Sequence, residues 1–160
     1  MFIPLGNTGQ YVEIDDECYG KVKNYKWKAI KSYNKILYTF YAVTKINRKL
    51  VRMHRLLLDL CRGEITDHID CNGLNNKLEN LRKCTLSQNQ YNKRKFENAK
   101  HSSKYKGVSL KKGKKWYAAI VVNKKFKHLG TYDNEIDAAK AYNEAALEYF
   151  GQFARINVFT

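Results

Sequence analysis

Hydrophobic and polar side chains alternate along the first third of the chain, and this stretch is rich in Tyr, Val, Ile and Thr. Alternation with a period of two, carried by β-branched and aromatic residues, is typical of strands with one buried face. Asn47-Arg48 predicts a turn before the last of these segments. The strands predicted from this pattern are 11–15, 25–30, 36–44 and 49–53.

The spacing becomes helical after residue 52, because the apolar positions then recur three and four residues apart. These positions are Met53, Leu56, Leu57 and Leu60. Short strands are predicted next over 65–70 and 81–85, and the polar loop between them holds Asn72, Gly73, Asn75 and Asn76. A helix over 86–94 follows, capped by Thr85 or Ser87. The middle of the chain therefore predicts strand, loop, strand and helix in succession.

The last third predicts three strands, over 105–110, 116–123 and 125–132, with turns at Lys112-Gly113 and Asn123-Lys124. Within the second strand, Trp116, Ala118 and Ile120 alternate with Tyr117, Ala119 and Val121. If the first set faces a helix, the second set faces outward.

A helix over 135–150 follows the third strand and ends at Gly151. Asn134 is the expected cap, with Asp137 three residues later in the manner of a capping box. The predicted apolar stripe of this helix is Ala139, Tyr142, Ala146 and Tyr149. The polar, basic segment before residue 104 predicts a linker with a domain boundary near residue 100.

The net charge of the chain indicates the class of its binding partner. The 160 residues suffice for one ordinary domain or two small ones, and 30 basic against 15 acidic side chains give a net charge of +15. Such an excess predicts a polyanionic partner, with nucleic acid first and an anionic membrane second. No apolar run approaches the roughly 18 residues of a membrane span, and residues 1–8 lack the features of a signal peptide. We therefore expect no membrane partner and a cytoplasmic location.

The basic charge is concentrated in residues 101–132, which hold nine lysines and no acidic side chain. A solvated lysine face is the alternative explanation for such a run. The four cysteines are Cys18, Cys61, Cys71 and Cys84. No two are spaced as CxxC, so we expect neither a structural zinc site nor, without a secretory signal, disulfides.

The candidate chemistry lies in Asp67-His68, followed by Asn80 and Asn89 at intervals of 12 (80 − 68) and 9 (89 − 80) residues. The predicted strand–loop–strand–helix can bring the helix start to the strand end, so that Asp67, His68 and Asn89 converge. A neutral imidazole can take a proton from water near neutral pH. A carboxylate and an amide oxygen suit Mg²⁺ or a similar hard ion. A lone Asp-His pair is usually structural, so the weight of this prediction rests on the whole spaced set.

The run Asp67-His68-Ile69-Asp70-Cys71-Asn72-Gly73, with Asn80-Leu81-Arg82, Thr85 and Gln88-Asn89, resembles the HNH (ββα-metal) nucleases, especially the phage and intron homing variety. The resemblance covers about 54–92 well and the N-terminal β region loosely. It implies that His68 is the general base, that Asp67 and Asn89 hold Mg²⁺ or another divalent ion such as Mn²⁺, and that Asn80 braces the loop. Asn89 stands where many HNH enzymes have a third histidine, and Cys71 where a small or polar residue is commoner.

His54, in a Met-His-Arg context, is a secondary catalytic candidate, and packing beside the core is its alternative role. His101, in the predicted linker, is expected to be solvated.

Residues 104–158 are similar to the Apetala-2 (ethylene-response-factor) DNA-binding domain. The similarity rests on Tyr105-Lys106-Gly107-Val108, Trp116 to Ile120, Leu129-Gly130-Thr131-Tyr132 and the Ala-rich helix. It implies a three-stranded antiparallel sheet packed on one helix, with the outer sheet face in the major groove. The DNA-binding residues expected from it are Lys106, Ser109, Lys111, Lys115, Tyr117, Lys125 and Lys127. The plant proteins use arginines where this chain has lysines, so their target sequence is not carried over.

Together these observations predict an α+β chain with a nuclease domain over 1–95, a linker over 96–103 and an Apetala-2-like domain over 104–160. The nuclease domain divides into a β-rich part, 1–53, and a ββα core, 54–95. The expected function is a homing-type endonuclease, encoded by a phage or mobile element of a bacterial host, that cuts double-stranded DNA. We expect a monomer, with a dimer as the alternative. A non-catalytic DNA-binding regulator with a decayed nuclease core is the second hypothesis, and RNA binding is the third.

Overall fold

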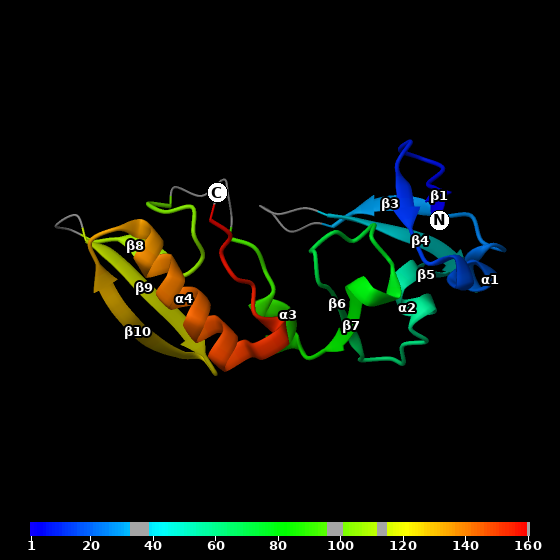
Figure 1. Cartoon of the computed structure of the whole chain (residues 1–160). Helices are drawn as coiled ribbons and strands as arrows, with labels where there is room; N and C mark the ends of the chain where they lie inside the picture. The colour runs from blue at the N-terminus through cyan, green and yellow to red at the C-terminus, as the bar shows by residue number, and fades with distance from the viewer. Residues whose placement is uncertain (33–38, 96–100, 112–114, 160) are drawn as a thin grey trace. The chain divides into compact units, whose positions relative to one another are not determined.

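The computed structural model describes residues 1–32, 39–95, 101–111 and 115–159. They form two compact units, Met1–Asn89 and Gln90–Thr160, each containing strands and helices (Figure 1). The fold class is therefore α+β, as the sequence predicts. The division between the units falls within the helix α3 (Leu86–Tyr91). The predicted linker, 96–103, lies partly outside the described residues, and the Lys112-Gly113 turn lies wholly outside them.

The N-terminal unit begins with two antiparallel sheets. β1 (Phe2–Pro4) pairs with β2 (Tyr11–Glu13), and β3 (Lys28–Lys31), β4 (Phe40–Ile46) and β5 (Lys49–Arg52) form a sheet in the order β3-β4-β5. The predicted turn is confirmed, since Asn47 and Arg48 both have positive φ, at 49° and 64°, as in the two-residue turns that suit twisted hairpins. The first residues of the predicted strand 36–44 lie outside the described residues.

Short helices close this unit around one core. They are η1 (Asp16–Cys18), α1 (Tyr19–Val22) and α2 (Met53–Leu57). The sequence pattern missed β1, η1 and α1, which have too few residues to show a period. The core they share contains Leu5, Val12, Ile14, Cys18, Val22, Trp27, Ala29, Ala42, Met53 and Leu57. Burial, with nearby acidic groups, raises the pKa of the Cys18 thiol, which favours its neutral form in this core.

A hairpin and a helix complete the N-terminal unit. β6 (Ile65–His68) pairs antiparallel with β7 (Leu81–Cys84), and the short helix η2 (Leu78–Asn80) lies directly before β7. The predicted Thr85 cap of α3 is confirmed: the Gln88 N–H donates to Thr85 Oγ1 at 3.2 Å, and the Thr85 N–H donates to Gln88 Oε1 at 2.8 Å. This reciprocal capping box fixes where the helix starts.

The C-terminal unit is a three-stranded antiparallel sheet with a helix on one face (Figure 1). Its strands are β8 (Val108–Leu110), β9 (Trp116–Val122) and β10 (Lys125–Tyr132), in the order β10-β9-β8. The helix α4 (Glu135–Phe150) has its predicted bounds, and the Asp137 N–H donates to Asn134 Oδ1 at 2.8 Å. The tail after α4 contains η3 (Gly151–Phe153).

Strand alternation decides which face of this sheet meets α4. Ala118 and Ile120 are buried against the helix, whereas Val121 is 55% exposed on the other face. The prediction that Tyr149 belongs to the apolar stripe of α4 is wrong. Tyr149 is 38% exposed, and Phe150 is buried in its place, stacked on Tyr91 with ring centroids 3.8 Å apart. No helix among the described residues is long and apolar enough to cross a membrane.

Candidate functional site

His68, the last residue of β6, is buried, and its imidazole contacts a buried amide. The distance from His68 Nε2 to Asn76 Oδ1 is 3.1 Å. Asn76 has no exposed surface, and its backbone N–H donates to the Glu13 carbonyl at 2.7 Å, which anchors the residue to β2. Burial lowers the pKa of His68, with the Asn76 contact and two nearby aspartates acting against it. The imidazole is therefore held in place and favoured in its neutral form.

Two aromatic rings pack around His68. His54, on α2, lies edge-on to His68 with centroids 5.0 Å apart, and Tyr41, on β4, lies 5.6 Å from His54 and 5.8 Å from His68. The Arg52 guanidinium carbon lies 5.3 Å from the Tyr41 ring centroid. Burial lowers the pKa of His54 to about 3, helped by His68 and two arginines. His54 is therefore a neutral packing partner of His68 at ordinary pH.

Asp67 precedes His68 and is held by an arginine. Asp67 and Arg82 are cross-strand partners in the β6–β7 hairpin, and Arg82 Nε and Nη2 both donate to Asp67 Oδ2, at 2.9 and 2.6 Å. Both side chains are largely buried, so the guanidinium balances a carboxylate charge that would otherwise be costly there.

Asn80 connects the two ends of the loop between β6 and β7. Its Oδ1 accepts from the Asp70 N–H at 3.0 Å, and its Nδ2 donates to Asp70 Oδ1 at 2.9 Å and to the Asn75 carbonyl at 2.8 Å. Its own carbonyl accepts from the Ile69 N–H at 2.9 Å. These bonds fix the backbone that follows His68.

Cys71 lies within this loop with φ at 63°, a conformation that favours glycine. Its N–H donates to the His68 carbonyl at 2.9 Å. Cys71, as a residue with a Cβ, therefore strains the backbone of the turn that begins at His68.

Asn89 lies half-buried on α3, where its N–H donates to the Thr85 carbonyl at 3.0 Å. Within the described part of the chain, no three His, Cys, Asp or Glu side chains gather into a metal-binding group. The expected donors, Asp67 and Asn89, offer one carboxylate and one amide oxygen. This set fits a hard divalent ion that retains water and phosphate oxygens as its other ligands.

The sequence pattern assigned no role in the site to four residues: Tyr41, Gly73, Asn76 and Arg82. Asn72 and Asn75 do form loop bonds, to the Leu74 N–H and to Asp70, as expected of asparagines in a turn. Asn76 also forms a loop bond, from its Nδ2 to the Gly73 carbonyl at 3.5 Å, and in addition it contacts His68. The signal that could have identified Arg82 is the register of the β6–β7 hairpin, which places it opposite Asp67.

Gly73 allows the loop to approach β4 closely. A Cβ on Gly73 would lie 2.5 Å from the Phe40 carbonyl oxygen and 2.6 Å from the Tyr41 ring. A larger residue at Gly73 would therefore displace Tyr41, which packs on both histidines.

Three of the lysines predicted to contact DNA form contacts within the C-terminal unit. Lys106 Nζ donates to the carbonyls of Tyr91 and Lys93, at 2.6 and 2.8 Å. Lys127 Nζ donates to the hydroxyl of Tyr149 on α4 at 3.1 Å, and strand alternation puts Lys125 on the same, helix-facing side. Lys115 forms an ion pair with Asp133. Lys125 and Lys127 thus lie on the helix side of the sheet, and contact of any of these four lysines with DNA stays a prediction.

The outer face of the sheet is instead mostly aromatic and aliphatic. We call Tyr117, Val121, Phe126 and His128 the aromatic face. The Tyr117 and His128 rings are parallel with centroids 4.2 Å apart, and Lys111 Nζ lies 4.0 Å from the Tyr117 centroid. Ser109, opposite Tyr117 on β8, lies on the same side. Lys115 lies on this side too, since it comes two residues before Tyr117 and its carbonyl accepts from the Lys111 N–H at 2.9 Å. The predicted DNA-binding residues on the outer side of the sheet are thus Ser109, Lys111, Lys115 and Tyr117.

Comparison with known proteins gave three relatives. The chain is 34% identical over 163 residues to an uncharacterized HNH endonuclease, L560, of Acanthamoeba polyphaga mimivirus, covering 98% of this chain and 80% of that protein. It is 41% identical over 61 residues to APETALA2-like protein 2 from the indica and japonica subspecies of Oryza sativa, covering 37% of this chain and 14% of the rice proteins. No family model matches the chain. No solved structure matches it.

Proposed function

Because the chain belongs to the HNH endonuclease family, we propose that it is a metal-dependent endonuclease of the homing type that hydrolyses phosphodiester bonds in double-stranded DNA. His68 is its general base, and the C-terminal sheet positions the enzyme on DNA. The observation that supports this most directly is the buried contact between His68 Nε2 and Asn76 Oδ1. We further propose that the enzyme acts as a monomer in the cytoplasm of its host.

The Asn76 contact selects a tautomer of His68. An amide oxygen accepts a hydrogen bond, so the proton lies on Nε2 and the basic lone pair on Nδ1. Nδ1 then takes the proton of the water that attacks phosphorus, while the bond from phosphorus to the leaving oxygen breaks. Asn76 is a positioning residue, because it acts through His68.

The other residues support the same chemistry. Asp67 and Asn89 would hold Mg²⁺ or Mn²⁺, which when bound neutralises charge on the phosphate and the leaving oxygen. Arg82 orients Asp67 and Asn80 holds the loop after His68. His54 supports the His68 ring by packing, and its pKa of about 3 argues against a role as a proton donor near neutral pH.

A plasmid-nicking assay tests this function. With Mg²⁺ or Mn²⁺ the full chain should nick supercoiled plasmid, and His68→Ala should lower the rate by about 100-fold or more with DNA affinity unchanged. Nicking at the wild-type rate by folded His68→Ala protein would sink the assignment of the base. DNA binding without cleavage under either metal would favour the alternative, a DNA-binding regulator with a decayed nuclease core.

A paired variant tests the positioning role. Asn76→Ala leaves the buried His68 Nε2–H without its acceptor, so the nicking rate should fall by about 10-fold or more, with KM for DNA unchanged. Asn72→Ala, in the same loop but exposed, is the matched control and should keep the wild-type rate. Equal rates for the two variants would contradict the role of Asn76.

A further inference from the structure

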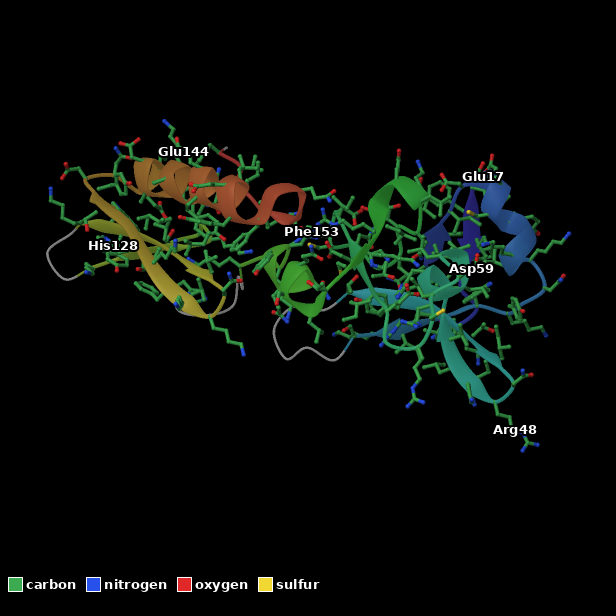
Figure 2. All side chains as sticks on the ribbon, turned by 90° about the horizontal axis from the view of Figure 1, so that it is seen from below. Glu17, Arg48, Asp59, His128, Glu144 and Phe153 are labelled. Carbon is green, nitrogen blue, oxygen red and sulfur yellow. The ribbon has the colours of Figure 1, made fainter. Side chains whose placement is uncertain are left out.

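The two apolar side chains of the aromatic face without a polar group, Val121 and Phe126, are exposed. Phe126 is 63% exposed and Val121 55%, and the two are cross-strand partners at the hairpin end of β9 and β10. His128 faces Ala119 across the same strands. Figure 2 labels His128 on this sheet and Glu144 on α4, the helix that covers the opposite face. Exposed apolar clusters of this kind on a folded unit mark binding surfaces.

The geometry of the rings limits what this face can bind. Tyr117 lies on the central strand β9, with Lys111 from the β8 side and His128 from the β10 side, each about 4 Å from its ring centroid. Both faces of the Tyr117 ring are therefore covered. Phe126 is nearly parallel to Tyr117, at 6.2 Å and 13°. Rings packed side by side across strands present their edges outward, which suits contact with small apolar groups better than stacking of bases.

Charge around the face selects the partner. Residues 101–132 contain nine lysines and no acidic side chain, and Lys111 and Lys124 are exposed beside the apolar centre. A cationic rim around an apolar centre complements duplex DNA, where phosphates flank the base edges.

The apolar centre also selects among bases. Guanine is recognised mainly by arginine, or by lysine, donating to O6 and N7. The chain has no arginine between His101 and Ala154. Among the described residues on this side, Lys111 lies over the Tyr117 ring and Lys115 is paired with Asp133. The apolar group that base pairs present in the major groove is the C5-methyl of thymine.

We propose that the aromatic face recognises thymine methyl groups in the major groove, with Phe126 and Val121 as the contacting side chains. This inference rests on the proposed function, because it requires that the C-terminal sheet binds duplex DNA. It gives the enzyme a preference for A·T pairs at the positions that this sheet covers, in place of the guanine contacts that arginines would make.

Uracil substitution tests the proposal. Duplexes are selected from a randomised pool with the full chain in EDTA, and are then resynthesised with deoxyuridine in place of thymine. Each lost methyl contact should weaken binding about fourfold, the equivalent of one buried methylene. Phe126→Ala should remove most of this discrimination, and its exposure means that the substitution leaves the core intact.

Lys124→Gln is the matched control. It should weaken binding to thymine and uracil duplexes by the same factor, because a phosphate contact does not depend on the methyl group of the base. Equal affinity of the wild-type chain for both duplexes, selection of G·C-rich sequences, or tighter binding to single strands would each overturn the proposal. A chain that nicks plasmid without thymine preference would refute this inference alone, whereas a chain that neither binds nor nicks DNA would refute the proposed function as well.

Discussion

His54 is a buried titratable group whose neighbours all oppose its protonation. It packs against the Tyr41 and His68 rings, and its pKa is lowered by burial first, and then by His68, Arg52 and Arg55, to about 3. In the unfolded chain the same side chain takes a proton as the pH falls through about 6.5. Folding therefore favours neutral His54, and stability is full above pH 6.5 and is lost progressively between about pH 6.5 and 3.

His54→Phe should make the N-terminal unit less sensitive to acid, because it keeps an aromatic ring and removes the titration. Between pH 7 and pH 5 the wild-type unit should lose about 2 kcal/mol of unfolding free energy to this group. The loss of unfolding free energy in the variant should be smaller than in the wild type by that amount, as measured by urea denaturation at the two pH values. His101→Gln, at an exposed histidine, is the control. A wild-type pH dependence in His54→Phe would refute the argument.

At the residue scale, side-chain chemistry was more predictable from sequence than side-chain direction. Asp67, His68, Asn80 and Asn89 were selected by type and spacing, and their catalytic roles stay predictions. For Lys106 the sequence predicts a DNA contact, which stays a prediction, but it does not predict that the ammonium binds carbonyls of Tyr91 and Lys93. Such bonds depend on where the segment 91–95 runs, and no local pattern contains that information.

Helices and turns are predicted best from the sequence where the hydrophobic periodicity and a capping or turn residue indicate the same boundary. The bounds of α4 are the predicted ones, since Asn134 caps its start and Gly151, with φ at 52°, ends it. The two-residue turn at Asn123-Lys124 is confirmed by positive φ at both residues. By contrast, β1 has three residues, and its pairing with β2 is a tertiary contact that a local pattern cannot show.

Gly107 joins β8 to α4 through an unusually close approach. Its φ is +76°, and a Cβ there would lie 1.8 Å from Tyr142 Cδ2. Tyr142 is buried in the core of the C-terminal unit, and burial raises its pKa to about 12. The sheet and helix can therefore pack at this distance only with glycine at this position.

Gly107→Ala should destabilise the C-terminal unit by about 3 kcal/mol or more, from overpacking and backbone strain together. Differential scanning calorimetry should show a lower transition temperature for this unit and an unchanged one for the N-terminal unit, because the cores are separate. Gly20→Ala, in α1 with open space around the Cβ position, should leave both transitions at or above their wild-type temperatures. A neutral Gly107→Ala would contradict the packing described here.

At the scale of the whole molecule, the net charge of +15 predicts DNA binding that weakens steeply with salt. The structure sorts the lysines that can contribute. Lys111 and Lys124 are exposed around the outer face of the C-terminal sheet, whereas Lys127 lies 3.1 Å from Tyr149 on the helix side. Composition gives the total charge, but only the fold shows which lysines share a face.

Lys111→Gln and Lys124→Gln should each reduce the slope of log Kd against log salt concentration by about 0.9, the equivalent of one phosphate contact. Lys127→Gln should leave the slope at its wild-type value. The three slopes are measured by filter binding at salt concentrations between roughly 50 and 200 mM, the range over which counterion release changes affinity strongly. Equal changes in slope for all three variants would show that the lysines contribute through the total charge of the chain and not through one face of the sheet.

The division of the two tryptophans between the units has a practical consequence. Trp27 is buried in the N-terminal core, with its Nε1–H donating to the Val22 carbonyl, and Trp116 packs on the C-terminal core. The chain has no other tryptophan. Each unit thus carries its own intrinsic optical probe. In Trp116→Phe the emission would come from the N-terminal unit, and in Trp27→Phe from the C-terminal unit. Each variant would therefore report unfolding or binding of one unit by itself.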